Sequence, residues 1–267
     1  MSSSLTSRAL PASGSLTPTI LTYHEVLPSR RRSLYSVSCD QFRSHVVMFE
    51  GLAHQPHRLP QITFDDGHVS NHEYAASILQ SASLYATFFL TAGFIGNNPG
   101  FMGWTQIREL VACGHSFGAH GWSHCFLTQA SDQQLRIELH KSRFSIEDNL
   151  GCVVDSISLP GGRYDARVLR FAIEAGYRRV YTSQPWLYKR IEGSLEVFGR
   201  VMVRRDMSLA YVRSIANQTA YARTRIWLER SMRVTVKSCL GDGVYHALWS
   251  QMSGRARQLG SLGRDRV

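Results

Sequence analysis

Short runs of apolar and β-branched residues recur along most of the chain and are separated by amphipathic stretches. The clearest run is Ala86–Thr91, an unbroken stretch of residues that favour β-structure. Such a run is typical of a strand in a parallel sheet covered on both faces. The same kind of run predicts further strands at residues 19–23, 61–64, 116–120, 155–159, 179–182 and 196–203.

In the stretches between these runs, apolar residues return every three or four positions, as on one face of a helix. This spacing predicts helices at residues 40–51, 71–81, 104–113, 131–150 and 166–175. Alternating strands and helices indicate right-handed parallel β-α-β units. With about seven strands, the predicted fold is α/β, a distorted and nearly closed (β/α) barrel. Its chemistry is expected where strands end and loops begin.

The sequence predicts three parts of unequal character. Residues 1–18 are rich in Ser and Thr and are expected to be disordered, residues 19–206 to form the barrel, and residues 207–267 a basic helical extension. The chain carries a net charge of +10, and residues 200–267 hold 13 basic and 4 acidic side chains. This basic segment could contact nucleic acid, anionic lipid or an acidic polymer, or simply be a solvated helical face. We expect peripheral membrane contact and no specific nucleic-acid binding.

Composition narrows the class of protein. A chain of 267 residues with 43% hydrophobic and 19% charged residues is typical of a folded globular domain. We find no apolar run of transmembrane length and no hydrophobic segment of a signal peptide near the N-terminus. The five cysteines include no C-x-x-C pair, which argues against a disulfide framework or a zinc ribbon. We therefore expect a cytoplasmic chain, with peripheral contact at the inner membrane face.

Two carboxylates close one of the predicted strands, in the segment Thr63–Gly67. If Asp65 and Asp66 both face the rim of the barrel, their repulsion needs a cation or a shared proton. The alternative is an Asp-Gly turn in which one Asp caps the next helix.

Two imidazoles, His120 and His124, follow another predicted strand at a spacing of four residues. On one helical turn this spacing places both on the same face, close enough to hold one ion. Two histidines and one carboxylate suit zinc or another first-row divalent metal. Chance is the alternative, because the chain holds 11 histidines.

Together, Thr63–Gly67 and His120–His124 resemble the first two motifs of the polysaccharide deacetylases, the NodB-homology group or carbohydrate esterase family four. Leu159–Asp165 is similar to a variant of the third motif of this family. Leu21–His24 is similar to the first strand of its exopolysaccharide-associated members. The resemblance covers roughly residues 19–205 and implies a distorted barrel of about seven strands.

The resemblance implies that the protein removes acetyl groups from N-acetylated sugars of a polysaccharide or its precursor. Asp66, His120 and His124 would hold one divalent metal ion, with Zn²⁺ as the first candidate. Asp65 would be the general base that takes a proton from metal-bound water, which attacks the acetyl carbonyl. The implied substrate contacts are Pro160, Gly161, Arg163 and Trp186.

Three departures from the family pattern concern the catalytic groups. Ser158 stands where the family has an arginine that pairs with the base, and Arg163 is a candidate substitute. Thr182–Trp186 keeps only the tryptophan of the fourth motif. The Leu-x-His that supplies the general acid is missing from Val201–Asp206. His24, at the end of the first strand, is the candidate for this role, and the alternative is that it only hydrogen-bonds within the rim.

These gaps leave two rival functions. One is a catalytically weak family member that binds glycans. The other is an O-acetyl carbohydrate esterase, whose leaving group needs less help from an acid. A serine hydrolase is a third alternative, because Gly114–Gly118 fits the G-x-S-x-G pattern around Ser116. That pattern requires a strand before the serine and a helix after it, and here the predicted order is reversed.

Overall fold

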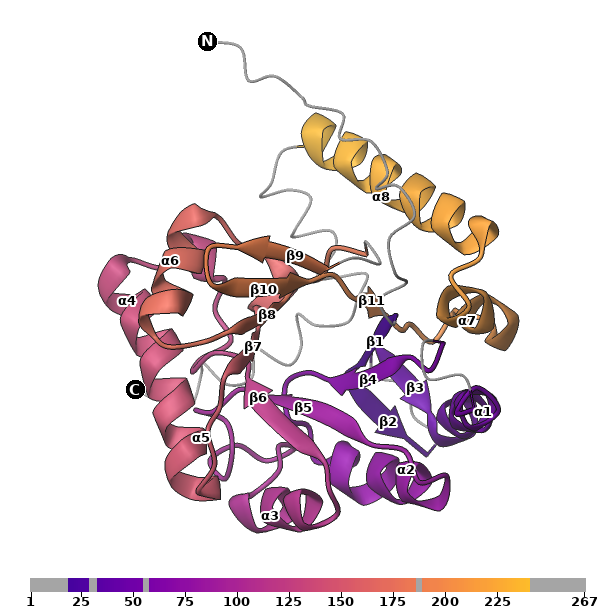
Figure 1. The fold of residues 1–267 in the computed structure, drawn as a ribbon, viewed down its shortest axis with the longest axis horizontal. Helices are drawn as coiled ribbons and strands as arrows, with labels where there is room; N and C mark the ends of the chain where they lie inside the picture. The colour runs from indigo at the N-terminus through magenta and orange to yellow at the C-terminus, as the bar shows by residue number, and fades with distance from the viewer. Residues whose placement is uncertain (1–18, 29–32, 55–57, 186–188, 241–267) are drawn as a thin grey trace.

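A curled sheet of nine strands dominates the computed structural model, which describes residues 19–28, 33–54, 58–185 and 189–240. The order across the sheet is β11-β1-β4-β5-β6-β7-β8-β10-β9 (Figure 1). All neighbouring strands are parallel except β9 and β10. The strands are β1 (Ile20–Tyr23), β4 (Gln61–Phe64), β5 (Ala86–Leu90), β6 (Ser116–Ala119), β7 (Ser156–Ser158), β8 (Arg179–Tyr181), β9 (Lys189–Glu192), β10 (Leu195–Phe198) and β11 (Val201–Met202).

Helices cover the outside of this sheet, and a second, two-stranded sheet lies beside it (Figure 1). The small sheet pairs β2 (Glu25–Leu27) with β3 (Ser36–Ser38). The longer helices are α1 (Cys39–Glu50), α2 (Ala76–Ser81), α3 (Trp104–Ala112), α4 (Asp132–Arg136), α5 (Ser142–Leu150), α6 (Ala166–Glu174), α7 (Leu209–Ala216) and α8 (Ala220–Leu240). Short π and 3₁₀ turns are η1 (Asn71–Ala75), η2 (Leu127–Gln129), η3 (Ile137–Lys141) and η4 (Pro160–Gly162).

Local chemistry explains where several helices begin. Ser38 accepts a hydrogen bond from the backbone N–H of Gln41 at the start of α1, and Asp165 does the same for Val168 at the start of α6. Such caps satisfy backbone donors that have no partner within the helix. The layer between the sheet and the helices is aromatic: the rings of Phe64 and Phe88 stack with centroids 4.9 Å apart, and Phe42 of α1 packs edge-on against Phe64. The predicted fold class, a distorted α/β barrel, is confirmed.

The main sheet has nine strands rather than the expected seven, and one predicted strand is divided into two. Residues 196–203 do not make one strand, because β10 pairs with β8 while β11 pairs with β1. These are far apart in the strand order, so Gly199 and Arg200 carry the chain across the opening between them. The antiparallel strand β9 was not predicted from the sequence.

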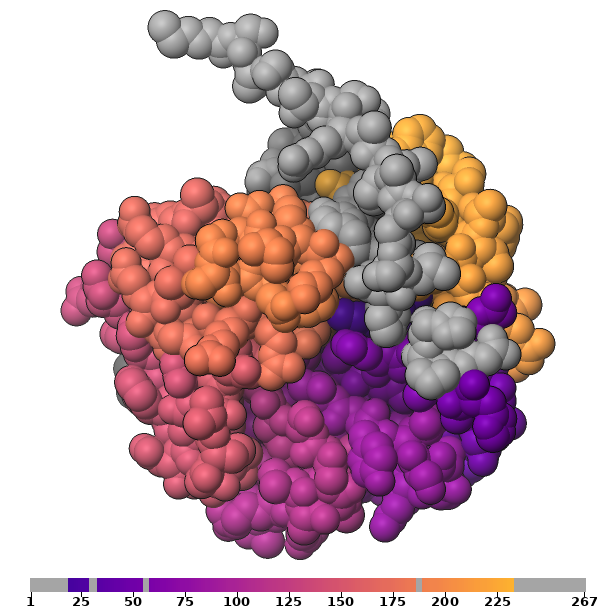
Figure 2. Space-filling model, viewed as in Figure 1, coloured from indigo at the N-terminus to yellow at the C-terminus, as the bar shows by residue number. Residues whose placement is uncertain are grey.

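The C-terminal helices are joined to the barrel core. Helix α7 packs on α1, and Val212, Ile215 and Ile226 are buried in the main apolar cluster. The Thr19 hydroxyl also donates to the Ile215 carbonyl. Figure 2 shows the outer surface of α8 at the edge of the molecule. No helix in the described ranges is both long and apolar enough to cross a membrane. The disorder predicted for residues 1–18, and the helix predicted beyond residue 240, lie outside the described residues.

Candidate active site

Three strands bring the predicted catalytic and ligand residues to one rim of the barrel. His24 follows β1, Asp65 and Asp66 follow β4, and His120 follows β6. Because these strands are parallel, their carboxyl ends meet at the same edge of the sheet. His24, Asp65, His120 and His124 line one cleft of about 350 Å³. The structure places these predicted residues at one cleft, and their roles stay predictions.

The backbone after β4 turns sharply to present both carboxylates. Asp66 has φ 75°, in the left-handed region, and Gly67 follows with φ 85°. A Cβ at Gly67 would lie 2.9 Å from the Ile95 side chain, so a larger residue does not fit there. Neither aspartate caps the next helical turn, whose N-terminal residue is Ser70. The alternative of a simple capped turn therefore does not describe this segment.

Asp66, His120 and His124 converge on one point. The Asp66 Oδ1 atom lies 3.3 Å from His120 Nε2 and 3.1 Å from His124 Nε2. The Nδ1 of His120 lies 2.8 Å from the Ser158 carbonyl and donates to it, which leaves a lone pair on Nε2 facing Asp66. Among the described residues, Asp66 Oδ1 and His124 Nε2 are buried atoms without a hydrogen-bond partner. Acceptors that face one another in this way need a cation or a shared proton between them, and this donor set fits a divalent metal.

The titration of the cluster agrees with a site that favours positive charge. Burial acts to raise the pKa of Asp66, but the neighbouring imidazoles of His124 and His120 outweigh it and hold the pKa well below its ordinary value. Burial acts to lower the pKa of His120, yet the carboxylates of Asp65 and Asp66 raise it overall. The same site thus stabilises negative carboxylates and a positive partner between them.

Asp65 lies beside these ligands and faces a different partner. Its carboxylate is 3% exposed and forms a buried ion pair with Arg200, with a distance of 2.8 Å between Nη2 and Oδ2. Burial acts to raise the pKa of Asp65, but the charge of Arg200 outweighs it and the pKa falls to about 2. Asp65 is therefore ionised at neutral pH, as a proton acceptor must be.

Sequence reasoning missed Arg200 and named Arg163 as the substitute cation. The structure corrects this: the Arg163 guanidinium lies over the Phe126 ring, 4.5 Å from its centroid, while Arg200 pairs with Asp65. The local signal that could have found Arg200 is its place directly after Gly199 within the apolar run 195–203. An arginine inside a barrel strand region needs a buried partner.

A buried glutamate holds the loop that carries the two histidines. Glu138, in the π-helical turn η3, is 2% exposed. One of its oxygens accepts hydrogen bonds from the backbone N–H groups of Trp122 and Ser123, at 2.7 and 3.0 Å. The other accepts from the Ser123 hydroxyl. Three bonds to one carboxylate fix the path of the chain between His120 and His124.

The predicted substrate residues fall in different places. Gly161 and Arg163 line the cleft, and Pro160 is buried beneath it in η4. Trp186 lies outside the described residues. A wall that the sequence did not predict comes from the C-terminal helices. Its residues are Tyr211, Ile226, Glu229 and Arg230.

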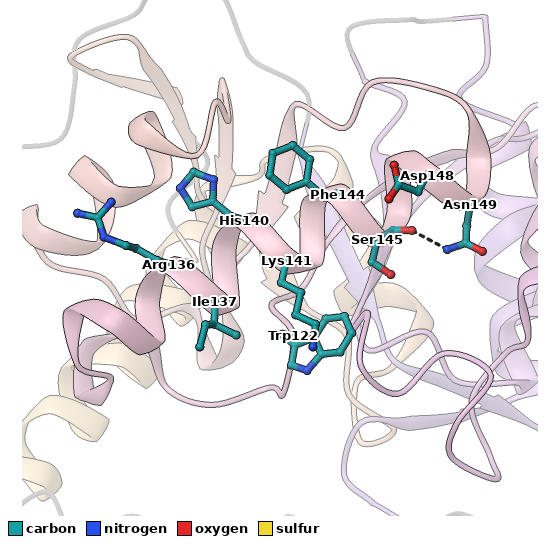
Figure 3. Close-up of a pocket in the computed structure, with 9 residues that line it drawn as sticks. All are labelled: Trp122, Arg136, Ile137, His140, Lys141, Phe144, Ser145, Asp148 and Asn149. Atoms are coloured by element: carbon teal, nitrogen blue, oxygen red, sulfur yellow. Dashed lines mark hydrogen bonds between the residues drawn. The ribbon is translucent and has the colours of Figure 1, made fainter.

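A larger hollow of about 630 Å³ lies elsewhere, on the outer face of η3 and α5 (Figure 3). Trp122 stands at its edge, with the Lys141 ammonium 3.8 Å from the centroid of the indole. None of the predicted site residues lines it. The size of a hollow therefore does not identify the site here, and the cluster of titratable groups does.

The serine alternative does not have the required surroundings. Helix α3 precedes Ser116, and Ser116 is the first residue of β6. Ser116 thus begins the strand, whereas His120 follows its end, so the two residues lie at opposite ends of β6. A nucleophile elbow needs the reverse order, with the serine after a strand and before a helix.

Comparison with known proteins agrees with the fold and with the resemblance of the motifs. Residues 54–180 match the family model of polysaccharide deacetylases. A putative polysaccharide deacetylase, YxkH of Bacillus subtilis, is 30% identical over 55% of this chain and 52% of its own length. The peptidoglycan-N-acetylglucosamine deacetylase PgdA of Listeria monocytogenes is 31% identical over 40% of this chain and 22% of its own length. The chain thus spans about half or less of the length of these curated relatives.

Solved structures share the fold. The Streptococcus pyogenes deacetylase PplD superposes with a TM-score of 0.65 at 21% identity, covering 75% of this chain and 99% of that one. IcaB from Ammonifex degensii gives a TM-score of 0.63 at 23% identity, covering 74% and 96%. The fold of this chain is thus the distorted barrel that these deacetylase structures share. The family that the chain matches is that of the polysaccharide deacetylases, and the resemblance inferred from the motifs is confirmed.

Proposed function

We propose that this protein is a metal-dependent hydrolase that removes acetyl groups from N-acetylated sugars of a polysaccharide or its precursor. The observation that carries this proposal is the convergence of Asp66, His120 and His124 at a cleft that is lined by both histidines and the ionised Asp65. Three ligands with open coordination positions next to a separate carboxylate are what metal-assisted hydrolysis needs.

Each residue has a defined task in this proposal. Asp66, His120 and His124 would hold the ion, with Zn²⁺ as the first candidate. The ion would supply Lewis acidity, polarising the acetyl carbonyl and lowering the pKa of a water. Asp65 accepts the proton of the attacking water, and His24 at the same rim donates a proton to the departing amine.

The cleft supports a carbohydrate substrate. Arg163, Glu229 and Arg230 offer polar groups along its walls, and Phe126 offers an aromatic ring. Sugars present hydroxyl groups at their edges and apolar C–H faces, so polar and aromatic groups together suit them. The deacetylase relatives act on acetylated glycans by name, which supports the same substrate class here.

The test is acetate release from acetylated oligosaccharides by the purified protein, first stripped of metal and then reconstituted with Zn²⁺. We expect activity to depend on the metal. His120→Ala and His124→Ala should each lose most of the bound metal, whereas Asp65→Asn should keep the metal and lose turnover.

His72→Ala is the matched control, because His72 pairs with Glu109 at the surface, away from the cleft. Full metal content in both ligand variants would refute the site. An O-acetyl esterase is distinguished by faster release from O-acetylated than from N-acetylated sugars. A weak glycan-binding member is distinguished by binding without release.

We also propose that helix α8 contacts an anionic membrane surface. Its inner residues Ala222 and Ile226 are buried, while four large apolar side chains on its outer surface are 48–60% exposed. These are Tyr221, Trp227, Leu228 and Met232. Exposed apolar groups on a basic helix are typical of binding at a lipid interface. The cytoplasmic location expected from the sequence stays a prediction.

A further inference from the structure

Arg200 reaches the centre of the barrel from the segment that crosses its opening. It lies in the chain between β10, which is next to one edge of the sheet, and β11, which is the opposite edge, and it is 1% exposed. Its guanidinium lies 5.4 Å from the ring centroid of Phe89 and 5.8 Å from that of Tyr181. A buried guanidinium is stable only when it is paired and hydrogen-bonded, and the carboxylate that pairs with it is Asp65. The place of Arg200 in the fold is therefore tied to Asp65.

The hydrogen bonds to the two oxygens of Asp65 are unequal in number. The Arg200 Nη1 donates to Oδ1 and Nη2 donates to Oδ2, both at 2.8 Å. The Ser158 hydroxyl donates to Oδ2 as well, at 3.1 Å, and is held there by a 2.7 Å bond from Arg200 Nη2. Each carboxylate oxygen has two lone pairs. Within the described part of the chain, Oδ2 thus has both lone pairs used, and Oδ1 keeps one.

We propose that Arg200 and Ser158 are the positioning residues of Asp65, which fix the plane of its carboxylate and leave Oδ1 as the atom that accepts the proton. This inference rests on the proposed function. In that step an O–H bond of the attacking water breaks, its proton bonds to Oδ1, and its electron pair stays on the water oxygen that attacks the acetyl carbon. A bidentate arginine sets such an orientation more firmly than a single donor can.

The geometry also indicates that the guanidinium can be supplied from β7. The Ser158 and Arg200 side chains touch each other and the same carboxylate oxygen. Shortening Arg200 to serine removes the guanidinium that contacts residue 158, and we expect an arginine at 158 to take its place beside Asp65. An exchange of the two residues is therefore a direct test of positioning, because it restores the cation without restoring the original side chain.

The experiment compares Arg200→Ser with the exchanged double variant Ser158→Arg/Arg200→Ser. For Arg200→Ser we expect kcat to fall by about 100-fold or more, with KM within threefold and metal content unchanged. The exchanged variant should recover at least about tenfold of the lost kcat. Arg179→Ser is the matched control, because Arg179 pairs with Asp155 at the surface.

Several results would overturn the proposal. One is a folded, metal-loaded Arg200→Ser protein with kcat within threefold of the wild type. Another is an exchanged variant that folds and binds metal but recovers nothing. If Arg200→Ser does not fold, Ser158→Ala decides: it should fold, keep its metal and lose about five- to tenfold in kcat, because Oδ2 regains a free lone pair. An unchanged kcat would contradict the assignment. A wild-type protein that releases no acetate would refute the proposed function itself.

Discussion

Asp66 and His124, two of the three proposed metal ligands, have backbone conformations that non-glycine residues rarely adopt, with φ 75° and 61°. Each such conformation costs about 1–3 kcal/mol and persists only where the surroundings enforce it. Here the surroundings are the Gly67 turn on one side and the Glu138 bonds on the other. Two strained residues among three ligands indicate that the fold keeps these side chains in place at a cost in stability.

His24 gives the first prediction at this scale. Its ring lies 5.0 Å from that of Tyr35, at the rim that carries Asp65. If His24 is the acid, His24→Ala should keep its metal and slow amide hydrolysis by more than about tenfold, because expelling an amine requires a proton. Cleavage of an activated acetyl ester should be affected much less. Tyr35→Ala controls for lost packing, and equal losses on both substrates would assign His24 a binding or structural role.

His45 gives a second prediction, which concerns acid stability. It is fully buried in α1, and burial lowers its pKa to about 4. Between pH 6.5 and 4 the unfolded chain therefore binds a proton that the folded chain does not, so the free energy of unfolding falls as the pH falls. At pH 5 the loss is about 2 kcal/mol. Urea denaturation of the wild type and of His45→Gln at pH 7.5 and pH 5 measures it, and parallel pH dependence would contradict it.

Residues that are neighbours in sequence could be predicted, and those joined only by the fold could not. Asp65, Asp66, His120 and His124 stand in short motifs beside predicted strands, so their meeting at one rim followed from the parallel order. Arg200 is 135 residues from Asp65 in the chain. Nothing in its local sequence states which carboxylate it meets, because that depends on how the barrel curls.

At the scale of elements, the loop between β6 and α4 depends on a turn that the helical pattern did not show. Residues 131–150 were predicted as one helix, and the chain there is α4, the π-helical turn η3 and α5. The extra residue of a π turn shifts the side chains that follow it around the helix, and such turns are frequent at functional sites. In this protein the turn places Glu138 beside the loop that carries His120 and His124.

The third prediction follows from that contact. Glu138→Ala removes three hydrogen bonds from the loop, and we expect affinity for Zn²⁺ to fall by about 10- to 100-fold, as for other groups that orient ligands. Glu138→Gln keeps an acceptor for the two backbone N–H groups, so its affinity for Zn²⁺ should lie between those of Glu138→Ala and the wild type. Chelator competition measures affinity without any turnover. Glu174→Gln, which pairs with Arg136 at the surface, is the control. Equal affinities of Glu138→Ala and wild type would contradict the prediction.

The elements that could be predicted are those with a clear period. Strand β4 has the predicted bounds, and α3 and α6 differ by one residue. The prediction failed at the last strands of the sheet: β9 was not predicted, and β10 and β11 are separated by two residues in one apolar run. A pattern of apolar residues reports burial, but it does not report which edge of the sheet each half of the run joins.

At the scale of the whole molecule, the outer surface of α8 is basic and carries exposed apolar side chains, whereas the barrel is nearly neutral. The inner surface of this helix lines the cleft through Ile226, Glu229 and Arg230. Deleting the helix would therefore damage the site as well as any membrane contact. Substitutions on the outer surface separate the two effects.

The fourth prediction uses that separation. The wild type should float with vesicles that contain phosphatidylglycerol and not with phosphatidylcholine alone, because the extension is basic. Trp227→Ser/Leu228→Ser should float less and keep its metal. Val153→Ser/Ile191→Ser removes exposed apolar groups elsewhere and should float like the wild type. Flotation that the α8 substitutions leave unchanged would reject the membrane role. If instead the wild type is a dimer and these substitutions make it a monomer, the partner of this surface is a second copy of the chain.

The crossing at Gly199 and Arg200 has a consequence for the order in which the protein matures. During synthesis all three proposed metal ligands have emerged by residue 124, whereas the cation for Asp65 follows 76 residues later than His124. Strand β1 likewise waits for β11 before its outer edge is paired. A nascent chain that has reached residue 180, where the family match ends, thus contains all three proposed ligands and Asp65 but not the arginine that pairs with Asp65. Under our proposal the group that orients the base is therefore added last, and full hydrolytic activity awaits the final strand of the barrel.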